Sequence, residues 1–259
     1  MADKGIMVTK EEGILSITLN RPEKLNTMTL EMKTSITQAI KEAEQDKEVR
    51  VTVITGAGRA FCAGVDLGVF EDITPISLLE DQQIIKEMIL SIVNTSKPVI
   101  AAVNGAAVGI GYSLVLACDI IIASEKARFG GVWVLRGLHP DGGASYLLAR
   151  RLGIGKACEL LLTGEIIDAF KAEKIGLANR VVPPDKLEVA AREMAAALTK
   201  GAPLAVGMTK ASIYQGLAMD LSTMLDYETR AQAMLSFTED CKEAMAAFLE
   251  KREPVFGWR

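Results

Sequence analysis

The chain has 259 residues, 49 % of them apolar, so it can bury a sizeable core in one large domain or two smaller ones. A formal net charge of −4 argues against general nucleic-acid binding, and we expect no nucleic-acid partner. The sequence has no run of about 18 apolar residues, and its first residues lack the apolar segment of a signal peptide. We therefore expect no membrane span and a cytoplasmic location.

The cysteines and the single histidine limit the possible redox and metal chemistry. The four cysteines are far apart and form no CxxC pair, which favours reduced thiols over a disulfide framework or a zinc site. His139 is the only histidine, so a multi-histidine metal site is excluded. A serine triad could be built only around that residue.

The first part of the chain predicts a hairpin, a helix and a buried strand. Alternating apolar residues over 6–9 and 14–19 indicate two strands joined by a tight turn. Thr29 is a suitable N-cap for a helix through residue 44, and its apolar residues fall on one face. The apolar run 51–54 predicts the next strand.

A glycine-rich stretch at 104–111 follows the predicted strand at 99–103. The simplest interpretation is strand, glycine-rich turn and helix, which leaves free backbone N–H groups and the positive end of a helix dipole at the turn. Such a place can bind phosphate or stabilise an oxyanion, although close packing alone also explains the glycines. The dinucleotide fingerprint lacks its third glycine, so a nucleotide site is weakly supported.

Strands and helices alternate up to about residue 150, which predicts mostly parallel pairing. A helix is expected over 77–95, and short strands are expected near 120–123 and 128–129. Because ligands bind beyond the carboxyl ends of parallel strands, the 56–67 loop and the 104–111 turn should form one site. After residue 142 the pattern is mainly helical, and apolar helix faces near the C-terminus must be buried against the sheet or another subunit.

Several segments in a fixed order resemble the crotonase, or enoyl-CoA hydratase/isomerase, superfamily. They are NRP at 20–22, LN at 25–26, AFCAGVDL at 60–67, KP at 97–98, NG at 104–105, LTG at 162–164, AEKIGLA at 172–178 and EAMAAFLEKR at 243–252. The resemblance implies an α/β fold, a crotonase-like spiral of ββα units with a helical C-terminal region. It further implies a spiral core over 1–200, a helical trimerisation region over 201–259, and a homotrimer or a dimer of trimers.

The resemblance also implies an acyl-CoA thioester substrate and no cofactor beyond the coenzyme A that the substrate carries. It places the two backbone N–H donors of an oxyanion hole at Val65 and Ile110. Each such donor lowers the barrier by a few kcal/mol, on the order of 10²–10³ in rate. The residues implied for substrate and coenzyme A binding are Lys24, Leu25, Ala63, Gly64, Asp66, Leu67, Ser113 and Trp133, with Phe248 and Lys251 supplied by the next subunit.

Two departures from the family pattern decide the expected chemistry. Hydratases of the family use two glutamates, but Ser113 and Trp133 stand at those positions. Because hydration needs a base for water and an acid for the α-carbon, hydratase activity is doubtful. One carboxylate remains, Asp141, at the position that resembles the catalytic acid of some family isomerases. A single carboxylate suffices to move a double bond if apolar surroundings, such as Trp133, raise its pKa.

Other functions remain open beside the isomerase. Asp141 could be the nucleophile of a dehalogenase-like reaction on an aromatic acyl-CoA, but that branch takes a histidine base from the helix at 77–95, where none is present. A conventional hydratase, a thioesterase triad of His139 with Ser113 or Ser145, and a non-catalytic acyl-CoA-binding subunit are further alternatives. If Asp141 merely caps its own helix, the binding subunit is favoured. If it faces the cavity of the two N–H donors, an enzyme is favoured.

Overall fold

The computed structural model describes residues 5–66 and 74–258 and begins with the predicted hairpin. Strands β1 (Ile6–Glu11) and β2 (Ile14–Leu19) pair antiparallel. Helix α1 (Leu30–Gln45) starts at Thr29, whose side chain accepts a hydrogen bond from the Met32 N–H. The predicted hairpin and helix are both confirmed.

A six-stranded sheet forms the centre of the molecule. Its order is β1-β2-β3-β5-β7-β10, and every pair except β1 with β2 is parallel. The further strands are β3 (Val51–Gly56), β5 (Val99–Val103), β7 (Ile120–Ser124) and β10 (Arg180–Val182). Both faces are covered at the centre of the sheet, which explains why β5 is a continuous apolar run, whereas β2 alternates and the edge strand β1 is mostly exposed.

A second, four-stranded sheet of three-residue strands lies beside the first. Its order is β4-β6-β8-β9, with only β9 antiparallel. The strands are β4 (Ala60–Cys62), β6 (Ala106–Val108), β8 (Arg128–Gly130) and β9 (Ile166–Asp168). Successive turns of the chain place one strand in each sheet, which is the spiral expected from the resemblance. The glycine-rich stretch is therefore not a simple turn, because β6 lies within it.

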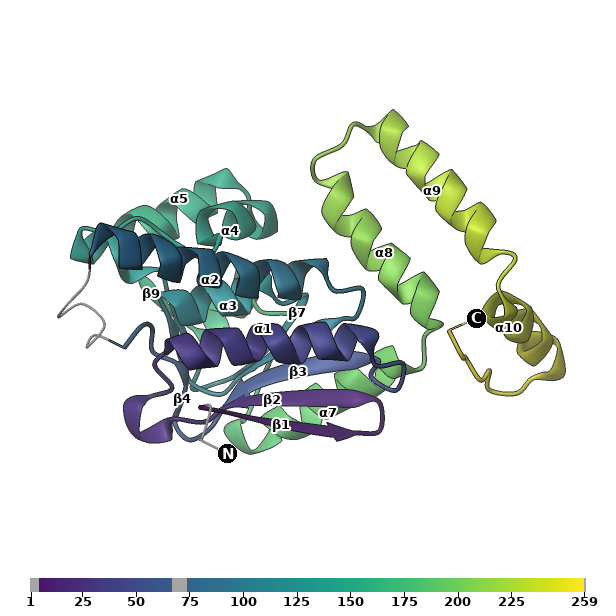
Figure 1. The fold of residues 1–259 in the computed structure, drawn as a ribbon, viewed down its shortest axis with the longest axis horizontal. Coiled ribbons are helices and arrows are strands. Elements are labelled where there is room, and N and C mark those ends of the chain that lie inside the picture. The colour runs from purple at the N-terminus through teal and green to yellow at the C-terminus, as the bar shows by residue number, and fades with distance from the viewer. Residues whose placement is uncertain (1–4, 67–73, 259) are drawn as a thin grey trace.

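Helices cover the two faces of the large sheet (Figure 1). The side chains of β5 alternate: Val99, Ala101 and Val103 pack with α1, α2 (Pro75–Asn94) and α3 (Ile110–Ala117), whereas Ile100 and Ala102 pack against α7 (Leu187–Thr199). The shorter helical segments are η1 (Pro22–Lys24), η3 (Val132–Arg136), α4 (Ala144–Leu152), α5 (Ile154–Thr163), α6 (Ala169–Lys174) and η4 (Pro184–Lys186).

Three C-terminal helices extend away from this body (Figure 1). They are α8 (Pro203–Gly216), α9 (Leu221–Leu235) and α10 (Glu239–Glu250), and we call them the C-terminal arm. Helix α9 buries none of its residues within the chain. None of the helices in the described part of the chain is long and apolar enough to cross a membrane.

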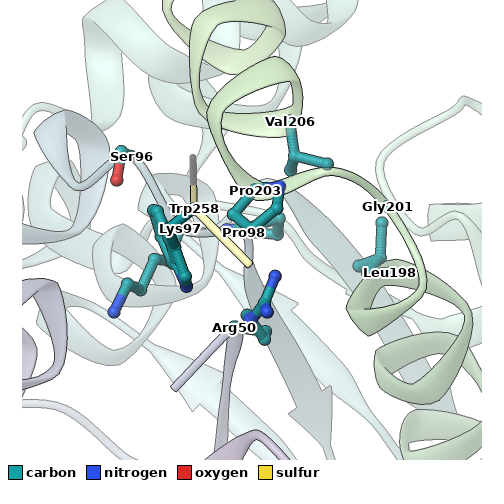
Figure 2. A pocket seen from close by; sticks show the side chains of 9 residues that line it. All are labelled: Arg50, Ser96, Lys97, Pro98, Leu198, Gly201, Pro203, Val206 and Trp258. Atoms are coloured by element: carbon teal, nitrogen blue, oxygen red, sulfur yellow. The ribbon is translucent and has the colours of Figure 1, made fainter. Parts of the chain in front are cut away.

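The last residues return from the arm to the body. The Trp258 ring lies 5.0 Å from Lys97 Nζ and 5.4 Å from Arg50 Cζ, beside the start of α8 (Figure 2). The buried Asp240 of α10 accepts hydrogen bonds from the N–H groups of Gly257 and Trp258, at 2.7 and 3.1 Å. These contacts hold the end of the arm against the core. Cations over an indole face are attracted to it, and hydrogen bonds from N–H groups to a charged carboxylate are stronger than those between neutral groups.

Candidate functional site

The loops after β3 and β5 meet, as the parallel sheet predicts. Gly64 (φ +115°) and Gly109 (φ +56°) have backbone angles that favour glycine. A Cβ atom added to Gly109 would lie 3.7 Å from the Gly64 Cα, so the two backbones are in contact. An atom added to Gly111 would lie 2.3 Å from the Cys62 carbonyl oxygen, which brings the first turn of α3 against β4. The absence of side chains is what permits this approach.

Both backbone groups that the resemblance assigns to an oxyanion hole lie at this junction. Val65 forms an isolated parallel bridge with Met28, in which the Met28 N–H donates to the Gly64 carbonyl at 2.8 Å. The N–H of the bridged Val65 consequently points to the opposite side. Ile110 is the first residue of α3, where N–H groups have no partner within the helix. Among the described residues, neither N–H donates a backbone hydrogen bond.

The NRP–LN segment holds the 60–67 loop in place. The buried Asn26 side chain accepts from the Arg21 N–H and donates to the carbonyls of Ala57 and Ala60, at 2.8–2.9 Å. The Arg21 guanidinium pairs with Asp66 at 3.1 Å. The two parts of the motif are thus joined through buried and partly buried polar contacts, which hold a loop more tightly than exposed ones.

Four of the residues expected to contact coenzyme A lie together, on the neighbouring segments 24–25 and 63–64. The Ala63 N–H donates to the Leu25 carbonyl at 3.1 Å, so these two residues are neighbours. Lys24 is exposed at the end of η1, and Gly64 is buried beside them. Leu67 lies outside the described residues.

Asp141 lies at the edge of the same junction. The Ser113 hydroxyl of α3 donates to the Asp141 carbonyl oxygen at 2.9 Å. A Cβ atom on the adjacent Gly142 (φ +55°) would lie 2.9 Å from Ile110 Cδ1 and 2.8 Å from Ser113 Cβ. The loop that carries Asp141 is therefore seated directly on the first turn of α3.

The Asp141 side chain does not cap the helix that follows it. Helix α4 has Gly143 as its N-cap residue and no side-chain hydrogen bond at that end. Instead, Gln82 Nε2 of α2 donates to Asp141 Oδ2 at 3.2 Å. The alternative in which Asp141 serves only as a helix cap is wrong.

The surroundings of Asp141 favour its protonated form. Burial raises the pKa of this carboxyl above its ordinary value, while the Gln82 amide, the Trp133 indole and the Lys33 ammonium act in the opposite direction. Asp141 Oδ1 is buried and has no hydrogen-bond partner within the described ranges. Trp133 of η3 is only 6 % exposed, but its indole lowers the Asp141 pKa, so the expectation that Trp133 raises it is wrong and burial is the largest cause of the raised pKa.

A serine triad finds no support in this geometry. His139 is exposed, and its Nδ1 lies 2.7 Å from the Pro140 carbonyl oxygen. Ser113 is buried but bonded to the Asp141 backbone, and Ser145 is exposed. In the described part of the chain, no cluster of His, Cys, Asp or Glu could hold a metal ion.

Phe248 and Lys251 are not brought to the other candidate residues within one chain. They lie on α10 and just after it, at the end of the molecule opposite β4 and the start of α2 (Figure 1). Phe248 is 81 % exposed. Their expected role in a neighbouring subunit stays a prediction.

Two polar contacts near Asp141 were not anticipated from the sequence. They are the Gln82 hydrogen bond and a buried ion pair between Lys33 of α1 and Asp81 of α2. Gln82 lies three residues before Ile85, at a position that continues the apolar stripe of its helix. A polar residue on the apolar face of a helix indicates a buried polar contact, so the position of Gln82 in the sequence could have predicted one.

Comparison with known proteins identifies the class to which this geometry belongs. The family model described as Enoyl-CoA hydratase/isomerase matches residues 9–259. A crystal structure of enoyl-CoA hydratase from Bacillus anthracis superposes with a TM-score of 0.96 at 34 % identity, covering 98 % of this chain and 100 % of that one. The chain therefore belongs to the enoyl-CoA hydratase/isomerase family, and it is an acyl-CoA enzyme with the crotonase fold.

Similar proteins within the family carry different names. Short-chain-enoyl-CoA hydratase from Clostridium acetobutylicum is 37 % identical over 249 residues, which cover 96 % of this chain and 95 % of that protein. The 1,2-epoxyphenylacetyl-CoA isomerase from Escherichia coli is 35 % identical over 251 residues, 95 % of each chain. Hydratase names predominate among these relatives.

Proposed function

We propose that this enzyme is an enoyl-CoA isomerase that moves a double bond with Asp141 as its single acid/base. The Asp141 carboxylate takes a proton from one carbon, and the electron pair of that C–H bond enters the conjugated enolate of the thioester. The proton then returns from Asp141 to the carbon two positions further along, so the product has the mass of the substrate. The N–H groups of Val65 and Ile110 bind the negative oxygen of the enolate.

The position of the Asp141 carboxyl is the observation that carries this proposal. The half-buried Asp141 lies beside the first turn of α3, its carboxyl does not bond its own helix, and its buried Oδ1 has no hydrogen-bond partner among the described residues. A half-buried carboxyl with a raised pKa, and with one oxygen that has no hydrogen bond in the described part of the chain, suits an acid/base that accepts and returns the same proton.

The positions of the two hydratase glutamates hold no carboxylate in this sequence, which argues against hydration. Ser113 and Trp133 stand where the resemblance expects the hydratase glutamates, and neither can act as a base or a proton source of that kind. Asp81 is the acidic side chain that affects the Asp141 pKa, but it is engaged by Lys33. Hydration nevertheless remains the second candidate, because most of the named relatives are hydratases.

Dehalogenase-like chemistry receives less support. The α2 side chain at Asp141 is Gln82, which cannot replace the histidine base of that branch. His139 is exposed and turned to Pro140. An isomerase reaction, in contrast, agrees with the name of the Escherichia coli relative, which is an isomerase.

Product masses from three substrate types test the proposal. Purified enzyme is offered 3-enoyl-CoA, 2-enoyl-CoA and aromatic acyl-CoA thioesters. We expect conversion of 3-enoyl-CoA without a change of mass, and a loss of at least about 10²-fold in kcat for Asp141→Asn. Asp185→Asn, an exposed carboxylate in η4, is the matched control and should keep its activity. Addition of water to 2-enoyl-CoA, abolished by Asp141→Asn, would instead identify a hydratase.

We also propose that the segment 201–259 is a trimerisation region. The arm leaves α9 without a buried residue, and Phe248 and Lys251 lie far from the other candidate residues of their own chain. In a homotrimer or dimer of trimers, these two residues would complete the coenzyme A site of a neighbour. That site would otherwise be formed by Lys24, Leu25, Ala63, Gly64 and Asp66.

A further inference from the structure

Gln82 crosses from α2 to the carboxyl group of Asp141, which lies 59 positions further along the chain. Its Nε2 donates to Oδ2 at 3.2 Å, whereas the buried Oδ1 has no partner within the described ranges. The two carboxyl oxygens are therefore unequal. Oδ2 accepts from a neutral amide, Oδ1 is buried without a hydrogen bond in the described part of the chain, and the Trp133 indole also interacts with the carboxyl group.

We propose that Gln82 is a positioning residue, which fixes the rotamer of Asp141 and reserves Oδ1 for proton exchange with the substrate. This inference rests on the proposed isomerase function. A carboxyl group without this contact could rotate about its terminal bonds, since that torsion has only broad preferences. Holding Oδ2 removes this freedom before the substrate arrives and keeps the geometry needed for proton transfer.

An amide suits both protonation states of the reaction cycle. It donates through Nε2 to the charged carboxylate and can accept through Oε1 from the O–H of the protonated acid. When the substrate C–H bond breaks, its electron pair enters the enolate and a new O–H bond forms at Asp141. When that O–H bond breaks, the proton forms a C–H bond two carbons away, and the carboxylate is restored with Gln82 still beside it.

Asp81, the residue before Gln82 on α2, is directed away from the Asp141 carboxyl and toward α1. Successive helix residues point about 100° apart, so Asp81 faces α1 while Gln82 faces Asp141. Asp81 pairs with Lys33, whose side chain is 2 % exposed. Lys33 from α1 and Asp81 from α2 act in opposite directions on the Asp141 pKa, and Trp133 contacts the carboxyl from η3.

The experiment compares Gln82→Met with Gln83→Met, a change at the exposed adjacent position of the same helix. Isomerisation of 3-enoyl-CoA is measured across pH. For Gln82→Met we expect kcat to fall about 10- to 100-fold with KM within about twofold, since a hydrogen bond to a charged group is lost. The acid limb of the kcat profile should move to higher pH, because the hydrogen bond that lowers the Asp141 pKa is gone. Gln83→Met should match the parent in both.

A second variant keeps the test decisive if Gln82→Met folds poorly. Gln82→Glu keeps the length of the side chain and places a like charge beside Asp141, so its acid limb should move further toward high pH. An unmoved limb in folded Gln82 variants, with Asp141→Asn inactive, overturns the inference and leaves the proposed function intact. Full isomerisation by Asp141→Asn overturns the proposed function itself.

Discussion

The surroundings of Asp141 carry a cost in stability, and its proposed role as an acid/base gives a reason for that cost. One of its oxygens is buried without a hydrogen bond among the described residues, and burial raises the pKa of the group. A buried polar atom without a partner costs about 1–3 kcal/mol of stability. Sites that trade stability for activity in this way are common in enzymes.

The cost of ionising Asp141 in the folded protein should appear in how the melting temperature depends on pH. A carboxyl whose pKa is raised on folding contributes stability that is full below its ordinary pKa of 3.8 and is lost as pH rises through the folded value. Replacing Asp141 with Asn removes that loss. We therefore expect Asp141→Asn to melt at a higher temperature than the parent at pH 7, and the difference to shrink toward acidic pH.

Calorimetric scans across pH are the measurement for this prediction. Asp185→Asn is the control, because its exposed side chain should leave the melting temperature unchanged over the same range. An Asp141→Asn protein that is less stable than the parent at pH 7 would mean that the carboxylate is stabilised, not strained, where it lies.

At the scale of elements, the site depends on how closely α3 approaches β4. Gly111 is inside α3, and the carbonyl oxygen of Cys62 occupies the space where a Cβ atom would stand, at 2.3 Å. The N–H groups of Val65 and Ile110 lie on the two sides of this contact. The spacing of these two N–H groups, the proposed oxyanion donors, thus depends on the absence of a side chain at Gly111.

Gly111→Ala should push α3 away from β4. We expect a loss of about 1–3 kcal/mol of unfolding free energy, because the backbone of β4 must move. The kcat of the folded variant should fall on the order of 10²-fold, since the two N–H donors separate. Denaturant unfolding and steady-state kinetics measure the two effects.

Gly155→Ala in α5 is the matched control for this change. An added Cβ atom meets nothing within 4 Å there, so alanine should be neutral or stabilising by up to about 1 kcal/mol. Equal unfolding free energies for the two variants would contradict the close approach of α3 and β4.

At the scale of the whole molecule, the C-terminal arm is too apolar for a free surface. Phe237 is 82 % exposed and Leu221 is 73 % exposed, while α9 buries nothing. Large exposed apolar patches mark interaction surfaces. The hydrogen bond between Asp240 of α10 and Trp258 of the C-terminal tail fixes the arm relative to the core. The arm therefore extends away from the core of its own chain and does not fold onto it (Figure 1).

We expect the purified protein to be a homotrimer or a dimer of trimers, and Phe237→Asp to shift it toward monomer. A charge without a partner in a buried interface is strongly unfavourable, and here it would be repeated in each copy. Light scattering after size-exclusion chromatography measures the mass. Asp226→Asn, an exposed change on α9, should keep the assembly of the parent. A parent protein that is monomeric at micromolar concentration would contradict the prediction.

Much of the fold and part of the site can be predicted from the sequence. The central strands of the large sheet are long enough to show a pattern. Residues 99–103 are uniformly apolar, and residues 51–54 are apolar except for the buried Thr52, because helices cover both faces. The strands of the small sheet have three residues each, too few for any period, so β6 was hidden within the glycine-rich stretch. The site loops could be placed at one edge because parallel strands share their carboxyl ends.

The sequence by itself determined the family and the two glycine-rich loops, and it singled out Asp141 as the proposed acid/base, because these depend on residue types in a fixed order. Only the tertiary structure decided which oxygen of Asp141 is held, by which side chain, and that the group does not cap α4. Gln82 and Asp141 are joined by packing between distant segments, and no local pattern reports such a contact. The residue types indicate which acid/base chemistry is possible, whereas the geometry of the site depends on how α2, α3 and the 141–143 loop pack together.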